Sequence, residues 1–179
     1  NWVPMVPVAE DPLTVGNRNS LRGALRIIAI SKYGQQVLSE AGFPNKHIYL
    51  PIPTEFYHPL NKEKCKEAFG WPANYYVIGN VGMNRGIRKG QDLLLQAFQI
   101  FVSEPHNSLL YLHTDHRSHD GLNLEDLASK LGVADRVKFP SRYDANFGWP
   151  PAKMLGLYNT FDLYVQPSLN EGQAMPVWE

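Results

Sequence analysis

Short apolar segments alternate with longer amphipathic segments through the second half of the chain. The apolar segments are YYVIGNVG (75–82), SLLYLHTD (108–115), RVKF (136–139) and DLYVQPS (162–168). Most of them are apolar at successive residues, as strands are when a sheet is buried on both faces. Parallel strands need a crossover connection, usually a helix, and the segments between these strands are long enough to supply one. The alternation therefore predicts an α/β fold, in which helices cover both faces of a parallel sheet.

The segments between these strands carry apolar residues at helical spacing. NLEDLASKLGV (123–133) predicts a helix that stops at Gly132, and PAKMLGLYNTF (151–161) predicts another. QDLLLQAFQIFVSE (91–104) predicts a helix whose inward face is made of Leu94, Ala97, Phe98, Phe101 and Val102.

The first third of the chain has a different pattern. The first fifteen or so residues are rich in proline and are expected to be extended. RIIAISKYGQQVLSEAGF (26–43) predicts a buried strand at 27–30, then a helix capped by Ser31 and stopped by Gly42. HIYLPIPTEFYHPL (47–60) predicts a strand that runs into a proline-punctuated connector.

That connector is the strongest linker signal in the chain. We therefore expect one domain at residues 1–52, a linker at 53–60 and a second domain at 61–179.

Composition excludes several classes of protein. Lys and Arg total 17, as do Asp and Glu, so no overall charge calls for nucleic acid. No run of 18 apolar residues is present to span a bilayer, and the first residues do not form a signal peptide. The single cysteine, Cys65, is expected to be a structural thiol in a reducing, cytoplasmic compartment.

A glycine-rich loop follows the first predicted strand of the second domain. GNVGMNRGIRKGQD (79–92) has neither the Gly-Lys-Ser/Thr order of a Walker loop nor the spacing of a dinucleotide fingerprint. It lets backbone approach a ligand at Gly82 and offers Arg85, Arg88 and Lys89 to a charged group. The alternative is a solvated basic turn.

A second loop near the end of the chain is bracketed by Glu171 and Glu179. Pro176 suits the first position of a helix, so Glu179 is expected in the first turn. The amides of Gly172 to Ala174 would form an anion site at that helix N-terminus. Carboxylates beside an anion site suit a ligand with both a phosphate and hydroxyl groups, whereas the alternative is a surface loop with one capping Glu.

The third feature is the histidine-rich stretch HTDHRSHDG (113–121). Its His and Asp side chains are metal-ligand types, but their spacing does not match known closed metal sites. A metal site is therefore the less favoured alternative. We expect instead a polar loop at a strand end, with His113 or Asp115 facing a crevice.

Together these features resemble the glycosyltransferase family 4 type of GT-B enzyme, from about residue 26 onward and in the right order. The upstream pieces that match are AISKYGQQVLSEAGF (29–43) and PTEFYHP (53–59). The pieces of the second domain that match are Gly82, Lys89-Gly90, DLLLQAF (92–98), LGVADRVKF (131–139), LYNTFDLYVQPS (157–168) and EGQAMPVWE (171–179).

The resemblance implies a Rossmann-like donor domain, the C-terminal half of a two-domain GT-B fold, and transfer of a sugar from a UDP-, GDP- or ADP-sugar. Such enzymes usually retain the anomeric configuration and need no metal or other cofactor. Glu171 would contact the transferred sugar as the catalytic-site carboxylate, Glu179 the ribose, and Lys89 the diphosphate. The implied remaining contacts are Val137, Phe139 and Pro140 with the base, and the amides of Gly172, Gln173, Ala174 and Met175 with sugar and phosphate.

The chain departs from the family pattern at several points. Met83 stands where Arg is common, so Arg85 or Arg88 would substitute for it. HTDHRS (113–118) replaces a glycine-containing turn. The stretch 141–151 is longer than usual, and its Phe147 and Trp149 would shape an acceptor or partner surface or simply pack.

The resemblance also implies that much of the acceptor-side domain precedes the first residue. We therefore expect this fragment alone to be inactive. The acceptor would be a glycan, a lipid-linked sugar or a small molecule, and peripheral membrane contact through the other domain stays open. The alternatives are a GT-B epimerase or phosphorylase, a non-catalytic nucleotide-sugar-binding or scaffolding homologue, and an NAD-dependent oxidoreductase, which the missing fingerprint disfavours.

Overall fold

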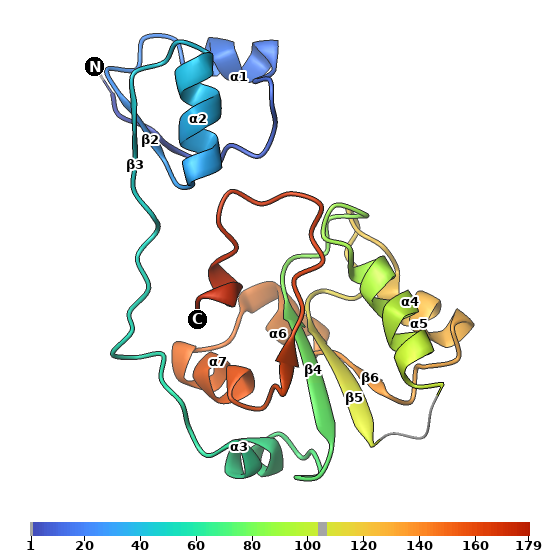
Figure 1. Ribbon diagram of the computed structural model, residues 1–179. Helices are drawn as coiled ribbons and strands as arrows, with labels where there is room; N and C mark the ends of the chain where they lie inside the picture. The colour runs from blue at the N-terminus through green and yellow to red at the C-terminus, as the bar shows by residue number, and fades with distance from the viewer. Residues whose placement is uncertain (1, 104–106) are drawn as a thin grey trace. The chain divides into compact units, whose positions relative to one another are not determined.

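The computed structural model describes residues 2–103 and 107–179. The chain forms two compact units, each of which can be followed in Figure 1. The first contains the chain up to Ile52 together with residues 170–178, and the second contains residues 53–169 and Glu179. The division at Ile52 falls within the proline-rich connector. The segment 170–178 has its contacts in the first unit, whereas the sequence pattern grouped it with residues 61–179.

The first unit is a small parallel sheet packed against a helix. Its strands lie in the order β1-β2-β3. The elements are β1 (Met5–Val6), α1 (Val15–Ser20), β2 (Ile27–Ala29), α2 (Lys32–Glu40), β3 (Asn45–His47) and a 3-10 helix η1 (Met175–Val177). The Ser31 hydroxyl caps α2 by accepting a hydrogen bond from the Gly34 amide at 3.0 Å, and Gly42 after the helix has φ of +81°.

Two strands of this unit differ from the expectation. The strand predicted at HIYL begins earlier, at Asn45, because its partner β2 has only three residues and pairs Ala29 with His47. Past that pair the Ile48 amide donates to the Ala29 carbonyl at 2.9 Å, and β2 ends at Ala29. The proline-rich start also contains a strand, β1, which Pro4 and Pro7 flank at the edge of the sheet, where a missing N–H is tolerated.

The second unit is a four-stranded parallel sheet in the order β6-β5-β4-β7. Its strands are β4 (Tyr76–Val81), β5 (Ser108–His113), β6 (Val137–Lys138) and β7 (Leu163–Tyr164). Its helices are α3 (Lys62–Ala68), α4 (Gln91–Phe101), α5 (Leu124–Lys130), α6 (Arg142–Phe147) and α7 (Pro151–Tyr158). The central strands β4 and β5 pair over their whole length, from Tyr76 with Ser108 to Val81 with His113. Their carboxyl ends therefore finish side by side.

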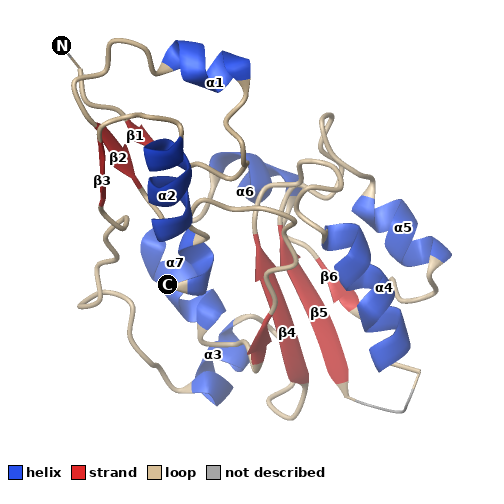
Figure 2. Ribbon diagram, turned by 45° about the horizontal axis from the view of Figure 1, so that its top comes forward, coloured by secondary structure: helices blue, strands red, loops and turns tan. Residues whose placement is uncertain are grey.

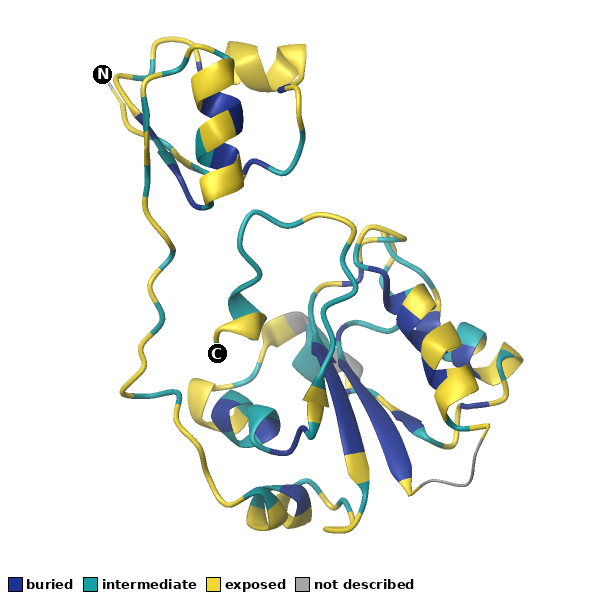
Figure 3. Ribbon diagram, viewed as in Figure 1, coloured by how far each residue is buried: buried dark blue, intermediate teal, exposed yellow. Residues whose placement is uncertain are grey.

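Helices cover both faces of this sheet, as Figure 2 shows. Successive residues of a strand point to opposite faces. Ile78 and Leu110 accordingly pack with α4 and α5, while Val77 and Leu109 pack with the α7 side chain Leu157. Figure 3 shows β4 and β5 buried along most of their length. The predicted class, an α/β fold with a parallel sheet between two helical layers, is confirmed.

The inward face of α4 is rotated from the predicted one. Ala97 and Phe101 are exposed, and Gln91 and Leu95 are buried in their place. The first turn explains the rotation, because the Gln91 amide is fully buried and donates to Asn80 Oδ1 and to the Gly82 carbonyl, each at 3.1 Å. The apolar residues of α4 lie on more than one face, so they allow several orientations of the helix. The hydrogen bonds of Gln91 select one of these orientations.

A buried ion pair joins α3 to the start of β7. The Lys66 ammonium, in a side chain only 5% exposed, donates to Asp162 Oδ2 at 2.7 Å and to the Tyr75 carbonyl at 2.8 Å. Asp162 also accepts from Lys62 and from the Val77 amide, each at 2.8 Å. Cys65 lies half-buried on the same helix, where burial raises the pKa of its thiol. None of the helices in the described ranges is both long and apolar enough to cross a bilayer.

Candidate functional site

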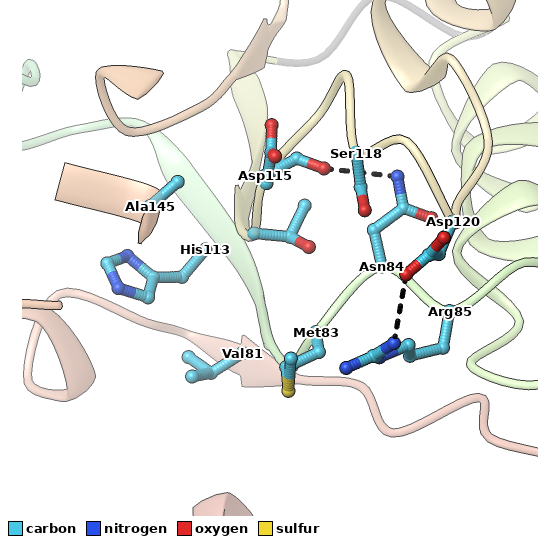
Figure 4. Close-up of a pocket in the computed structure, with 11 residues that line it drawn as sticks. Val81, Met83, Asn84, Arg85, His113, Asp115, Ser118, Asp120 and Ala145 are labelled. Carbon is cyan, nitrogen blue, oxygen red and sulfur yellow. Dashed lines mark hydrogen bonds and ion pairs between the residues drawn. The ribbon is translucent and has the colours of Figure 1, made fainter. Parts of the chain in front are cut away.

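A pocket of about 350 Å³ opens at the carboxyl ends of β4 and β5. This is the edge of a parallel sheet at which ligands usually bind. Figure 4 shows the side chains around it. The lining residues are Val81, Gly82, Met83, Asn84, Arg85, His113, Thr114, Asp115, Ser118, Asp120 and Ala145. They come from three loops that are far apart in the sequence, those after β4 and β5 and the stretch that contains α6.

Asn84 ties two of these loops together. Its side chain is 3% exposed and makes three hydrogen bonds with the loop after β5. The amide nitrogen donates to the carbonyls of Asp115 at 3.1 Å and Leu122 at 2.7 Å, and Oδ1 accepts from the Leu122 amide at 2.9 Å. A Cβ on Gly121 would lie 2.3 Å from the Asn84 Oδ1, so only glycine fits beside it. The Asn84 side chain therefore holds the loops after β4 and β5 together through hydrogen bonds to backbone groups.

The glycine-rich loop is anchored at its far end by Gly90. This residue has φ of +64° directly before α4, and a Cβ there would lie 2.2 Å from the Pro167 carbonyl oxygen. The Leu169 amide donates to the Arg88 carbonyl at 2.9 Å. The loop thus packs closely against the backbone that follows β7, which explains why glycine stands at this position.

Charges are distributed unevenly around the pocket. Arg85 pairs with Asp120 at 3.3 Å, and both side chains are well exposed, so the pair contributes little to stability. The dashed line in Figure 4 marks this contact. Asp115 lies on the same wall as Asp120, and His113 and Ala145 lie across the pocket from Arg85 in that view. An anionic ligand group would therefore find its cation at Arg85.

The structure brings together four of the residues that the sequence singled out. Gly82, Arg85, His113 and Asp115 all line this pocket. Arg88 and Lys89 lie further along the glycine-rich loop, outside the pocket lining.

The residues expected to meet a base lie elsewhere on the sheet edge. Val137 is a core residue of the α4 and α5 face. Phe139 packs against that core and against His116, with ring centroids 4.8 Å apart. Phe139 and Pro140 line a different cavity, of about 640 Å³, on the side of α7. A base contact by these three residues stays a prediction.

The loop 170–178 belongs to the first unit, where two of its residues have definite structural partners. Gln173 is held by the backbone of Leu50, which donates to its Oε1 at 2.8 Å and accepts from its Nε2 at 3.2 Å. A Cβ on Gly172 would lie 2.7 Å from the Cβ of Pro7. The predicted donor contacts of Glu171, Gly172, Gln173, Ala174 and Met175 stay predictions.

Glu179 lies in the second unit beside two tyrosines. The Tyr158 hydroxyl donates to Glu179 Oε2 at 2.5 Å. Burial, then the hydrogen bond and the charge of Glu179, raise the pKa of Tyr158, and burial followed by Glu179 raises that of Tyr57. The carboxylate is thus oriented by phenol groups, and its predicted contact with a ribose stays a prediction.

The histidine-rich stretch does not gather into a metal site in the part of the chain described. Among residues 2–103 and 107–179, no three His, Cys, Asp or Glu side chains are placed to hold a metal ion together. Asn84, Thr114, Ser118 and Ala145 were not predicted as site residues. The signal that could have found two of them is position: Asn84 lies three residues after Val81, which ends β4, and Thr114 directly follows His113, which ends β5.

No family model and no curated protein matches the sequence. Solved structures do match the fold. Sucrose-phosphate synthase from Thermosynechococcus elongatus superposes with a TM-score of 0.76 at 18% identity, over 97% of this chain and 46% of that one. The glycosyltransferase WaaG of lipopolysaccharide biosynthesis gives 0.71 at 21% identity, over 98% of this chain and 52% of that one.

The chain has the GT-B fold. Anabaena HepE, solved in complex with UDP and glucose, has the same fold, with a TM-score of 0.70 at 24% identity. The match with HepE covers 93% of this chain and 46% of that one. The chain thus spans about half the length of the solved GT-B structures that it matches.

Proposed function

We propose that this chain is part of a glycosyltransferase, and that its second unit binds the nucleotide-sugar donor. The observation that carries the proposal is the pocket at the carboxyl ends of β4 and β5, with a glycine-rich loop on one wall and Arg85 at its mouth. The GT-B fold supports it, as does HepE, a protein of that fold whose structure contains UDP and glucose.

Residues that line the pocket, together with others predicted from the sequence, suit different parts of such a donor. The glycine-rich loop 82–90 would hold the diphosphate, with Arg85, Arg88 and Lys89 neutralising its charge. Hydroxyl groups of the sugar and ribose would be bound by carboxylates, Glu171 and Glu179. The departing diphosphate would be stabilised by the same cations that bind it in the ground state.

The proposal also covers the roles of the domains, the stereochemistry of transfer, the acceptor and the location of the enzyme. Residues 1–52 would be the remnant of the acceptor-side domain, 53–60 the interdomain linker and 61–179 the donor domain. The transfer would retain the anomeric configuration, with a glycan, a lipid-linked sugar or a small molecule as acceptor. The enzyme would work in the cytoplasm without metal or other cofactor, in solution or peripherally at a membrane.

Calorimetric titration of the 179-residue chain with UDP, GDP, ADP and NAD tests the proposal. We expect one nucleoside diphosphate to bind, and NAD not to. Arg85→Ala and Lys89→Ala should each weaken binding about tenfold or more, since a charge-assisted hydrogen bond contributes about 1.5–3 kcal/mol. Glu179→Ala should weaken it as well.

Lys130→Ala is the matched control, because Lys130 is an exposed cation on α5 that pairs only with Asp126 among its described contacts. Binding that none of the three site variants weakens would contradict the proposal. Absence of any diphosphate binding would favour a scaffolding role.

A further inference from the structure

His113 is held at the wall of the strand-end pocket by two aromatic side chains. It is the last residue of β5, and its imidazole lies 4.6 Å from the ring centroid of Trp149. The Tyr111 hydroxyl lies 3.3 Å from its Nδ1. Figure 4 shows the ring beside Ala145, across the pocket from Arg85. The ring therefore has a fixed position on the side of the pocket away from the cation.

The imidazole is uncharged at neutral pH. Burial lowers the pKa of His113 to about 4; the nearby Asp144 carboxylate on α6 opposes this, and Lys153 on α7 adds to it. Burial keeps the Tyr111 phenol protonated by raising its pKa. The Tyr111 hydroxyl and His113 Nδ1 are within hydrogen-bond distance, and when the phenol donates to Nδ1 the ring proton is on Nε2. His113 thus offers one N–H donor and no charge.

The neighbouring residue supplies a second uncharged polar group. Thr114 is 4% exposed and lines the same pocket. Its hydroxyl has no hydrogen-bond partner within the described ranges of the chain. A buried hydroxyl normally has a partner, so Thr114 places a polar group without a described partner in the pocket wall next to His113.

This wall does not suit a phosphate. A neutral imidazole stabilises a dianion weakly, and the Asp144 carboxylate lies close to it. The Arg85 guanidinium is on the other side of the pocket. The part of a ligand that meets His113 and Thr114 should therefore be neutral, with an oxygen that accepts a hydrogen bond.

Trp149 acts on this wall without touching the pocket. It belongs to the long stretch 141–151 and is not among the lining residues. Besides His113 it contacts Phe69, at 5.7 Å between ring centroids, and the Lys153 ammonium lies 3.6 Å above its ring. These contacts fix the indole, and the indole in turn buries and orients His113.

We propose that His113, positioned by Trp149 and Tyr111, donates a hydrogen bond to a neutral oxygen of the nucleotide sugar and, with Thr114, determines which donor is accepted. The inference rests on the proposed function. The oxygen is either a carbonyl of the base or a hydroxyl of the sugar. Uracil and guanine carry such carbonyls and adenine does not, so the first source predicts a preference for UDP or GDP over ADP.

Titration calorimetry of His113→Ala, His113→Gln, Trp149→Ala and Trp149→Phe with UDP, ADP and UDP-glucose tests the inference. We expect the wild-type chain to bind UDP or UDP-glucose about tenfold more tightly than ADP. His113→Ala should lose most of this preference, and His113→Gln, which keeps an N–H donor, should restore part of it. If His113→Ala binds both UDP and UDP-glucose more weakly, the acceptor is a base carbonyl. If it binds only UDP-glucose more weakly, the acceptor is a sugar hydroxyl.

The Trp149 variants test the positioning role. Trp149→Ala should reproduce the loss of preference and should move the His113 imidazole pKa, followed by NMR, upward toward its ordinary value. Trp149→Phe should do neither. An unchanged imidazole pKa in Trp149→Ala, or an unchanged preference, would overturn the role of Trp149.

Arg85→Ala separates this inference from the proposed function. It should weaken all diphosphates alike and leave their ratio unchanged. If diphosphates bind, and His113→Ala binds UDP, ADP and UDP-glucose with the wild-type ratios, the present inference fails and the proposed function stands. If no diphosphate binds the wild-type chain, both fail.

Discussion

Asp162 connects α3, β4 and β7 through one carboxylate. Burial alone would raise its pKa, but hydrogen bonds from Lys62, Lys66 and the Val77 amide together lower it. A carboxylate whose pKa is lower in the folded state stabilises the fold above its ordinary pKa of 3.8. That contribution is lost as pH falls through the folded value. The second unit should therefore lose stability below about pH 4.

Replacing Asp162 by Asn should destabilise the second unit by about 3 kcal/mol, because it leaves the buried Lys66 ammonium without its counter-charge. Urea denaturation at pH 7 measures the change. Asp126→Asn, which removes an exposed helical pair with Lys130, should cost less than about 0.5 kcal/mol. Equal losses of stability in the two variants would mean that the buried ion pair contributes no more than the exposed one.

Gly90 and Gly86 have similar backbone conformations but different surroundings. Replacing each by Ala therefore separates the cost of a steric clash from the cost of a strained φ. Their φ values are +64° and +60°, so an Ala is strained at either position. A Cβ at Gly86 would meet nothing within 4 Å, whereas one at Gly90 would meet the Pro167 carbonyl oxygen at 2.2 Å. Gly86→Ala should cost about 1–2 kcal/mol and Gly90→Ala at least twice that, by urea denaturation. Similar costs would show that the backbone near Pro167 gives way easily.

At the scale of elements, the pocket depends on the tether that Asn84 makes between two loops. Asn84→Ala should leave the Leu122 amide and carbonyl without partners and cost about 2 kcal/mol. Hydrogen exchange should become faster at the Leu122 amide and remain slow in β5. Arg85→Ala is the control, since its exposed pair with Asp120 should leave the protection of Leu122 unchanged. Unchanged exchange in Asn84→Ala would contradict the tether.

Elements were predictable where one residue type sets a local conformation. Ser31 as a cap and Gly42 as a stop bound α2 as expected, because capping and positive φ are local properties. The orientation of α4 was not predictable, because it depends on the contact of Gln91 with Asn80, a residue on a strand. The start of β3 depends on the short length of its partner β2, and no pattern within β3 reveals that.

At the scale of the whole molecule, the chain contains separate cores. The first unit is built around Leu38 and the second around Leu110, each with 0% exposure. Leu38→Ala and Leu110→Ala should each cost about 2–5 kcal/mol in their own unit. Scanning calorimetry should show two transitions, with each variant lowering the midpoint of one of them. If both variants shift a single common transition, the units unfold together.

The candidate site was predictable to the extent that topology alone places residues. In a parallel sheet the residues after each central strand must meet at one edge, and this brought Gly82, Arg85, His113 and Asp115 to one pocket. The buried roles of Thr114 and Trp149 were not predictable, since each depends on side chains distant in sequence. Glu171 and its neighbours were assigned by resemblance, which gives no packing, so the contact of Gln173 with Leu50 was not foreseen.

The pocket lining begins where the core-facing part of the two central strands ends. Ile78 and Leu110 belong to the core, whereas Gly82, Thr114 and Asp115 follow the last residue pair of the two strands, Val81 with His113. Substitutions of exposed lining residues that hold no such tether, such as Met83, can therefore accumulate over evolution with little effect on folding. Proteins of one fold can in this way come to bind different ligands while their cores stay the same.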